Sequence, residues 1–160
     1  MWRTIRGERV SDVRQFVLTV CAEGRRLVDI GTDSMQLGGR TQFVTVLAIR
    51  NPGHGGRAVY RRETRPRMVS LRERLLREAW LSVDLGLALN DVIPDDADLT
   101  IHVDANPVPH HRSSLYVQEL TALVVSQGFR VALKPTAWAA TCAADHLLRG
   151  LADRAVRVAV

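Results

Sequence analysis

The fold is decided by the stretch VDIGTDS at residues 28–34. Its β-branched residues predict a strand that ends in the carboxylate of Asp33. Gly38 and Gly39 then supply a turn before the apolar run at residues 43–49. A central strand that ends in an acid is unusual unless a positive group meets the acid there.

A second stretch, LTIHVD at residues 99–104, has the same character and is broken at once by ANP at residues 105–107. It predicts another strand, which ends at Asp104. We therefore expect the two strands to lie side by side and to hold a divalent metal ion between Asp33 and Asp104.

The rest of the chain alternates strands and helices within one predicted domain, residues 1–160. Residues 1–10 are polar and without period, which predicts a loose end. Ser70 and Glu73 form a capping box that predicts the start of a long helix. The expected elements are a helix from residue 11 or 12 to 24, strands at 43–50 and 57–63, helices at 70–89 and from 113 or 114 to 127, a strand at 129–133 and a helix at 137–151.

This order predicts an α/β fold with a five-stranded mixed sheet, helices on both faces and an extra N-terminal helix. Strand–helix–strand units favour parallel pairing with right-handed crossovers, which gives the strand order 3-2-1-4-5. Ligands bind beyond the carboxyl ends of such strands, where the winding reverses. Neighbouring strands lie about 4.8 Å apart, so Asp33 and Asp104 are expected to be close together.

Glu78 falls on the apolar stripe of the predicted helix at residues 70–89, whereas Glu73 and Asp84 fall on its water-facing side. A carboxylate on the core-facing stripe is either an ion-paired structural acid or a ligand. Three acids together would not stay ionised without cations. Oxygen ligands alone suit Mg²⁺ or Mn²⁺ rather than zinc.

Four segments resemble the bacterial YkuK family, which is classed as ribonuclease H-like. They are IGTDS at residues 30–34, SLR at 70–72 with Glu78, IHVDANP at 101–107, and Lys134-Pro135 with AAD at 143–145. The similarity covers roughly residues 10–150. It implies the ribonuclease H fold, in which the first strand, the first core helix, the fourth strand and the last helix each carry one acid.

The resemblance places these four acids at Asp33, Glu78, Asp104 and Asp145, with Glu73 as an alternative to Glu78. It implies that they hold two Mg²⁺ or Mn²⁺ ions for phosphodiester hydrolysis. Four further residues are candidate substrate contacts: Ser34, His102, Asn106 and Lys134. His102 is also suited to a buried core position, and Lys134 to an ordinary surface position.

The formal net charge of +5 and the pI near 10.2 favour a polyanionic partner. Nearly all of the positive charge is arginine, and Lys134 is the sole lysine. A GC-rich genome, which favours arginine over lysine, is therefore an alternative explanation of the charge. The sequence thus predicts a nuclease acting on RNA, DNA or their hybrid; a non-catalytic nucleic-acid-binding module of the same fold is the alternative. No apolar run suits a membrane span. The first four residues lack the apolar segment of a signal peptide, so a cytoplasmic protein is expected, and the oligomeric state is left open.

Overall fold

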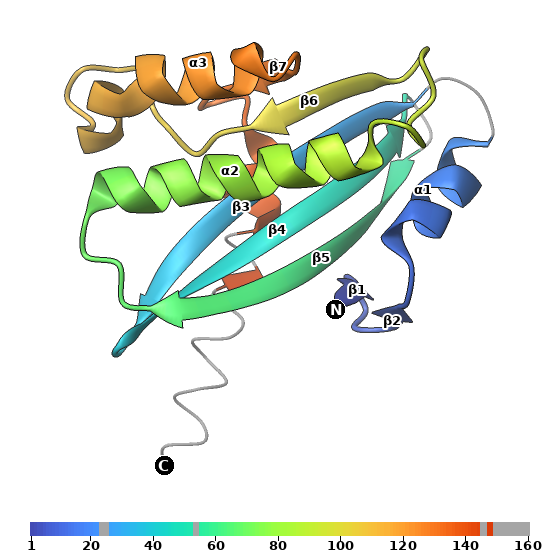
Figure 1. The fold of residues 1–160 in the computed structure, drawn as a ribbon, viewed down its shortest axis with the longest axis horizontal. Helices are drawn as coiled ribbons and strands as arrows, with labels where there is room; N and C mark the ends of the chain where they lie inside the picture. The colour runs from blue at the N-terminus through green and yellow to red at the C-terminus, as the bar shows by residue number, and fades with distance from the viewer. Residues whose placement is uncertain (23–25, 53–54, 145–146, 149–160) are drawn as a thin grey trace.

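A computed structural model describes residues 1–22, 26–52, 55–144 and 147–148 of the chain. These residues form a seven-stranded mixed sheet in the order β2-β1-β5-β4-β3-β6-β7, with helices packed on it (Figure 1). In chain order the elements are β1 (Trp2–Thr4), β2 (Arg9–Val10), α1 (Val13–Cys21), β3 (Leu27–Leu37), β4 (Arg40–Asn51), β5 (Gly55–Pro66), α2 (Leu71–Leu89), β6 (Asp98–His102), the 3-10 helix η1 (Arg112–Tyr116), α3 (Val117–Ser126), β7 (Arg130–Ala132) and the π-helical turn η2 (Ala139–Ala144).

The central five strands, β5-β4-β3-β6-β7, have the predicted order 3-2-1-4-5. β3 is antiparallel to β4 and parallel to β6. The prediction of five strands was wrong, however, because β1 and β2 extend the sheet beyond β5. Residues 1–10 are therefore not a loose end.

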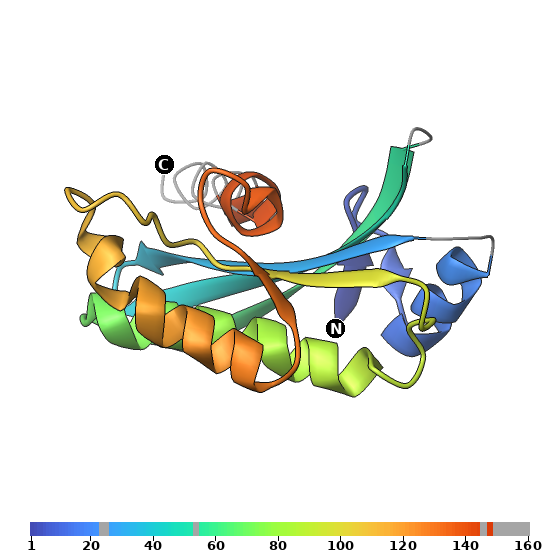
Figure 2. The same cartoon turned by 90° about the horizontal axis from the view of Figure 1, so that it is seen from above.

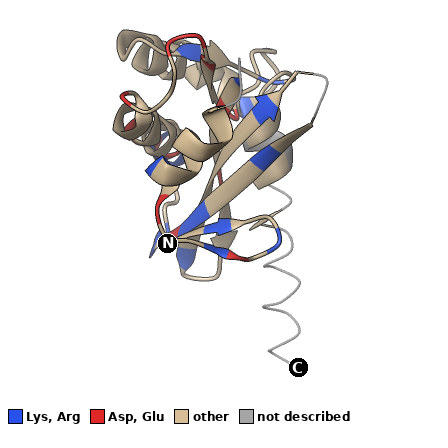
Figure 3. Cartoon of the chain, turned by 90° about the vertical axis from the view of Figure 1, so that its right-hand side faces the viewer, with Lys and Arg blue, Asp and Glu red and all other residues tan. Residues whose placement is uncertain are grey.

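Trp2 explains why the N-terminal segment joins the sheet. Its side chain is 9% exposed and belongs to the main hydrophobic core, and its backbone pairs with Arg61 of β5. The guanidinium of Arg61 lies 5.4 Å from the centroid of the Trp2 ring. The arginines of these edge strands make this side of the molecule basic (Figure 3). Burial of Trp2 thus holds the N-terminal segment on the sheet although most of the neighbouring residues are polar.

β3 continues past Asp33, contrary to the prediction that this acid ends the strand. Its pairing with β4 is unbroken from Leu27, opposite Arg50, to Leu37, opposite Arg40. Gly38, with φ of +57°, then reverses the chain. β6 is shorter and leaves β3 at His102.

The helices lie on both faces of the sheet, as predicted (Figure 2). α1 and α2 share the main core, and α3 lies on the same face, whereas η2 packs on the opposite face. Ser70 caps α2 by accepting a hydrogen bond from the backbone N–H of Glu73 at 3.3 Å. The helix predicted from residue 113 or 114 begins as η1 and becomes α3 only at Val117. No helix in the described ranges is long and apolar enough to cross a membrane.

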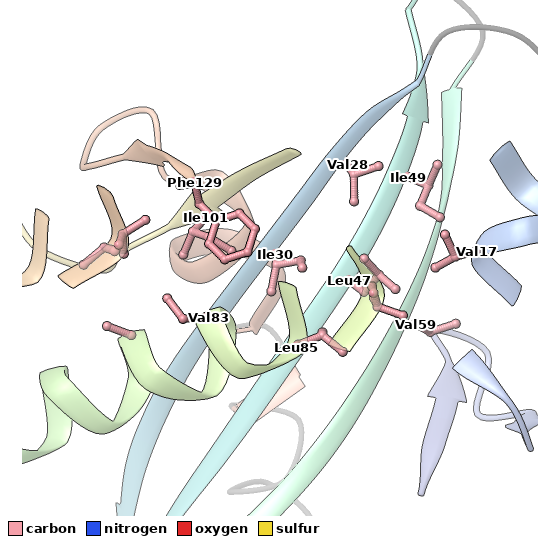
Figure 4. Packing of buried hydrophobic residues seen from close by; sticks show 14 of the residues in the cluster. Val17, Val28, Ile30, Leu47, Ile49, Val59, Val83, Leu85, Ile101 and Phe129 are labelled. Carbon is pink, nitrogen blue, oxygen red and sulfur yellow. The ribbon is translucent and has the colours of Figure 1, made fainter. Parts of the chain in front are cut away.

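The main core fills the space between the sheet and α2 (Figure 4). Val28, Ile30 and Leu47 of the strands belong to this core together with Val83 and Leu85 of the helix. Gly86 permits close approach of Phe129, since a Cβ at this position would lie 3.0 Å from the ring atom Cζ. A smaller cluster on the other face holds η2 and consists of Val44, Val46, Tyr60, Ala144 and Leu148.

The buried position of Trp2 predicts that Trp2→Ala lowers the free energy of unfolding by about 3 kcal/mol, as expected for loss of a buried tryptophan. Trp80→Ala is the matched control, because Trp80 is 42% exposed on α2; we expect a loss of about 1 kcal/mol or less. Urea unfolding of both variants measures the difference. Equal losses would mean that β1 does not contribute to the core.

Candidate active site

The candidate site forms where β3 and β6 separate. Their last paired residues are Gly31 and His102, and Asp33 and Asp104 each lie two residues further along the chain. β3 continues straight along β4, whereas the chain after β6 turns toward β7, where the backbone N–H of Val103 donates to Ala132 O at 2.9 Å. The separation opens a pocket between the two acids.

This acidic pocket contains three of the predicted acids, each from a different part of the fold. Asp33 comes from β3, Glu78 from α2 and Asp104 from the segment after β6. Five basic residues also line the pocket: Arg74, His110, His111, Arg112 and Lys134. The other lining residues are Ser34, Leu71, Leu75 and Ser113.

A buried polar contact fixes α2 over β3 at the level of the pocket. The hydroxyl groups of Ser82 and Thr32 are 2.8 Å apart, and Thr32 also donates to Thr45 Oγ1 at 3.0 Å. Ser82 Oγ donates in addition to the carbonyl oxygen of Glu78 at 3.1 Å. The backbone that carries Glu78 is therefore held against the central strand.

The Glu78 side chain is 6% exposed and faces the other acids. Its Oε1 accepts a hydrogen bond from Ser34 Oγ at 2.6 Å, and Ser34 Oγ accepts one from Arg74 Nη1 at 3.2 Å. Burial raises the pKa of the Glu78 carboxyl well above its usual value, and the charges of Asp33 and Asp104 raise it further. The Ser34 hydrogen bond and the Arg74 charge oppose this rise only in part.

Asp104 is paired with the only lysine of the chain. Lys134 Nζ lies 2.9 Å from Asp104 Oδ1, and the two side chains are 32% and 18% exposed. The backbone N–H of Lys134 donates to Ala105 O at 3.1 Å, which fixes the lysine beside the segment that carries the acid. In this pocket the charge of Asp104 is balanced by Lys134, whereas Glu78 is buried next to two other acids, which disfavours its charged form.

A model of the protein family described as Ribonuclease H-like matches residues 8–149, which is most of the chain. The chain belongs to the ribonuclease H-like family. Among solved structures, it is similar to ribonuclease H1 from the halophilic archaeon Halobacterium salinarum, at 15% identity and a TM-score of 0.39, over 72% of this chain and 89% of that one. A comparison with curated proteins gives no match. These matches do not distinguish the YkuK family, so that assignment stays a prediction.

The ribonuclease H-like fold brings five of the predicted residues into one pocket: Asp33, Ser34, Glu78, Asp104 and Lys134. Their roles stay predictions. Glu73, the alternative to Glu78, is exposed and lines a separate hollow beside Arg65 and Arg77, so Glu78 is the α2 acid that faces the pocket. Asp145 lies outside the described residues.

His102 does not line the acidic pocket and is 4% exposed, so its prediction as a substrate contact is corrected. Its Nδ1 accepts from the backbone N–H of Ala139 at 3.4 Å, and its Nε2 lies 2.9 Å from Asp29 Oδ1. This arrangement places the proton of a neutral ring on Nε2. His102 thus joins β3 and β6 to the start of η2.

Asp29 pairs with an arginine: Arg50 Nε donates to its Oδ2 at 2.6 Å. Burial raises the pKa of the Asp29 carboxyl, but the hydrogen bonds from His102 and Arg50 outweigh burial and lower the pKa below its usual value. Asp29, on the same strand as Asp33, is thus held by two basic neighbours.

Asn106 is also absent from the acidic pocket as the structure describes it. Its Oδ1 accepts from the backbone N–H of Val108 at 3.0 Å, and its own N–H donates to Ser113 Oγ at 3.0 Å. These bonds shape the loop that carries His110 and His111 to the mouth of the pocket. Substrate contact by Asn106 stays a prediction.

Sequence reasoning missed Arg74 and Arg112 as residues of the pocket. Arg74 lies four residues before Glu78 on α2, which is the spacing of helix neighbours and was a usable signal. Arg112 is brought to the pocket by the loop after β6. The sequence of a loop has no helical or strand periodicity, so this position could not be predicted.

Within the described residues, no group of three His, Cys, Asp or Glu side chains is placed closely enough to hold a metal ion as it stands. The donors of the pocket nevertheless fit a hard divalent cation, because Asp33, Glu78 and Asp104 supply only oxygen. Their mutual repulsion, which raises the pKa of Glu78, is the electrostatic condition that a cation relieves.

The raised pKa of Glu78 makes a prediction about stability and pH. A carboxyl whose pKa is higher in the folded than in the unfolded state stabilises the fold at low pH, and this stabilisation is lost as pH rises from the unfolded value near 4.5 through the folded pKa. We expect Glu78→Gln to be more stable than wild type at about pH 8 and to lose this advantage near pH 4.

Denaturant unfolding at several pH values measures this difference in free energy. Glu73→Gln is the matched control, because it removes an exposed carboxylate from the same helix. The same pH dependence in wild type and Glu78→Gln would show that the pocket does not raise the pKa of Glu78.

Proposed function

We propose that this ribonuclease H-like chain is a metal-dependent phosphodiesterase that hydrolyses nucleic acid in the acidic pocket. The observation that carries the proposal is the convergence of Asp33, Glu78 and Asp104 from three separate segments on one partly buried pocket. Asp29, by contrast, has a basic partner on each carboxylate oxygen, Arg50 and His102. Three facing carboxylates are costly to the fold and are expected where function requires them.

Asp33, Glu78 and Asp104 would hold Mg²⁺ or Mn²⁺, and we propose Asp145, which lies outside the described residues, as the fourth ligand. When bound, two such ions activate water and stabilise the leaving oxygen in phosphodiester hydrolysis. The YkuK resemblance supports the same four acids. The proposed substrate is RNA, DNA or their hybrid.

The chain's own residues have separate tasks in this proposal. Ser34 donates to Glu78 Oε1 and holds that carboxylate toward the pocket. Arg74 and Arg112, which line the same pocket, carry guanidinium groups suited to bidentate contact with a phosphate. The leucines at 71 and 75 form the apolar wall at the start of α2.

The proposal predicts that the wild-type protein hydrolyses at least one substrate from a panel of hybrid, single-stranded RNA, single-stranded DNA and branched DNA when Mg²⁺ or Mn²⁺ is added. We expect Asp33→Asn to lower kcat/KM by about 100-fold or more, since even indirect supports of a metal site cost about 10–100-fold. Asp84→Asn, an exposed acid on α2, is the control and should remain active.

If wild type leaves every substrate intact, the hydrolytic proposal is wrong. The alternative of a non-catalytic nucleic-acid-binding module would then be supported by binding that weakens steeply as salt increases. The excess of arginine favours binding to a polyanion. Formation of a cleaved nucleic-acid product distinguishes the nuclease from the binding module.

A further inference from the structure

The Lys134–Asp104 contact carries an inference that rests on the proposed function and concerns how the pocket accepts a cation. We propose that Lys134 is a built-in counter-ion for Asp104, which a divalent cation displaces on binding. The displaced ammonium group is then directed to the pocket, where it contacts a substrate phosphate.

The position of Lys134 is set by the backbone rather than by a chance reach of its side chain. β7 follows β6 in parallel, and their bonding continues beyond the strands through Val103 N–H to Ala132 O. Lys134 N–H then donates to Ala105 O at 3.1 Å, one residue beyond Asp104. The sheet therefore delivers the ammonium and the carboxylate side by side at the same edge of the pocket.

The contact is suited to exchange. It joins one nitrogen to one carboxylate oxygen at 2.9 Å, and about a third of the lysine side chain is exposed. A partly exposed pair of this kind is weak, and a lysine has a compact charge on a flexible stem. A divalent cation carries twice the charge, and it would attract Asp33 and Glu78 at the same time as Asp104.

The neighbouring half of the pocket supplies the driving force. Glu78 is buried among negative charges, and both Asp33 and Asp104 contribute to its unfavourable environment. The Lys134 ammonium contacts Asp104, whereas a divalent cation shared among the three carboxylates would reduce the repulsion among all of them. Lys134 thus neutralises Asp104 while the cation is absent and leaves that carboxylate when it arrives.

The single lysine permits a direct test that does not depend on activity. In a protein prepared as residues 1–160, an amine-reactive acylating reagent has two targets, the Lys134 side chain and the α-amine of Met1. Labelling rates of both amines are followed by mass spectrometry with and without saturating Mn²⁺. Binding of Mn²⁺ is established in parallel from the increase in Tm.

We expect Mn²⁺ to increase the labelling rate of Lys134 about threefold or more, consistent with release from a weak pair, while the rate at Met1 stays unchanged. The Asp104→Asn variant is the reference for a lysine without its carboxylate partner, and its Lys134 should be labelled rapidly even without Mn²⁺.

A second measurement compares the Kd for Mn²⁺ among variants. We expect Lys134→Met to bind Mn²⁺ about threefold more tightly or better than wild type, and Lys134→Arg to show no such gain. Arg130→Met, which removes a charge from the other end of β7, should leave the Kd for Mn²⁺ unchanged.

An increase in Tm with Mn²⁺, together with an unchanged or slower labelling rate at Lys134, would overturn the inference and leave the proposed metal site intact. If Mn²⁺ raises the Tm of none of these proteins, the metal site itself is refuted and the inference with it. The two failures are therefore distinguishable.

Discussion

The parallel pairing of β3 with β6 is the constraint on which the rest of the structure depends. It stops at Gly31 and His102, and the next residues that face the opening are Asp33 and Asp104. A shift of one residue in this register would turn the side chains of a strand to the opposite face of the sheet. The apolar residues that keep the register, Val28 and Ile30, therefore also determine where the acids lie.

The acidic pocket combines fixed backbones with an unfavourable charge distribution. The contact between Ser82 and Thr32 holds α2 in place, so Glu78 remains close to the other acids instead of moving away from them. Arg74, through Ser34, and Lys134 limit the repulsion without removing it. A site of this kind costs stability, as functional sites commonly do, and the large apolar core on the same face of the sheet offsets that cost.

Asp29 shows what a structural acid looks like in this protein. Asp29 is buried, but His102 and Arg50 satisfy both of its carboxylate oxygens. The same histidine accepts a hydrogen bond from the first residue of η2 and thereby helps to place the last helical segment. Burial alone therefore does not distinguish these acids: Asp29 is buried beside Arg50 and His102, whereas Glu78 is buried beside Asp33 and Asp104.

Local sequence determined the elements and much of the sheet order. The capping box at Ser70, the apolar stripe of α2 and the alternation of strands with helices were sufficient to predict the central order 3-2-1-4-5. They also singled out Asp33, Glu78 and Asp104, which line one pocket and whose roles stay predictions. These features depend on residues within a few positions of one another, where periodicity and capping chemistry apply directly.

Tertiary structure decided the features that depend on residues distant in the chain. Trp2 joins the N-terminal segment to β5 because a complementary core surface exists there, and β4 extends β3 beyond Asp33 because their pairing is unbroken. The lysine at position 134 meets Asp104 only after β7 has aligned with β6. Sequence periodicity reports which side of an element is buried, but it carries no information about which distant side chain will lie opposite.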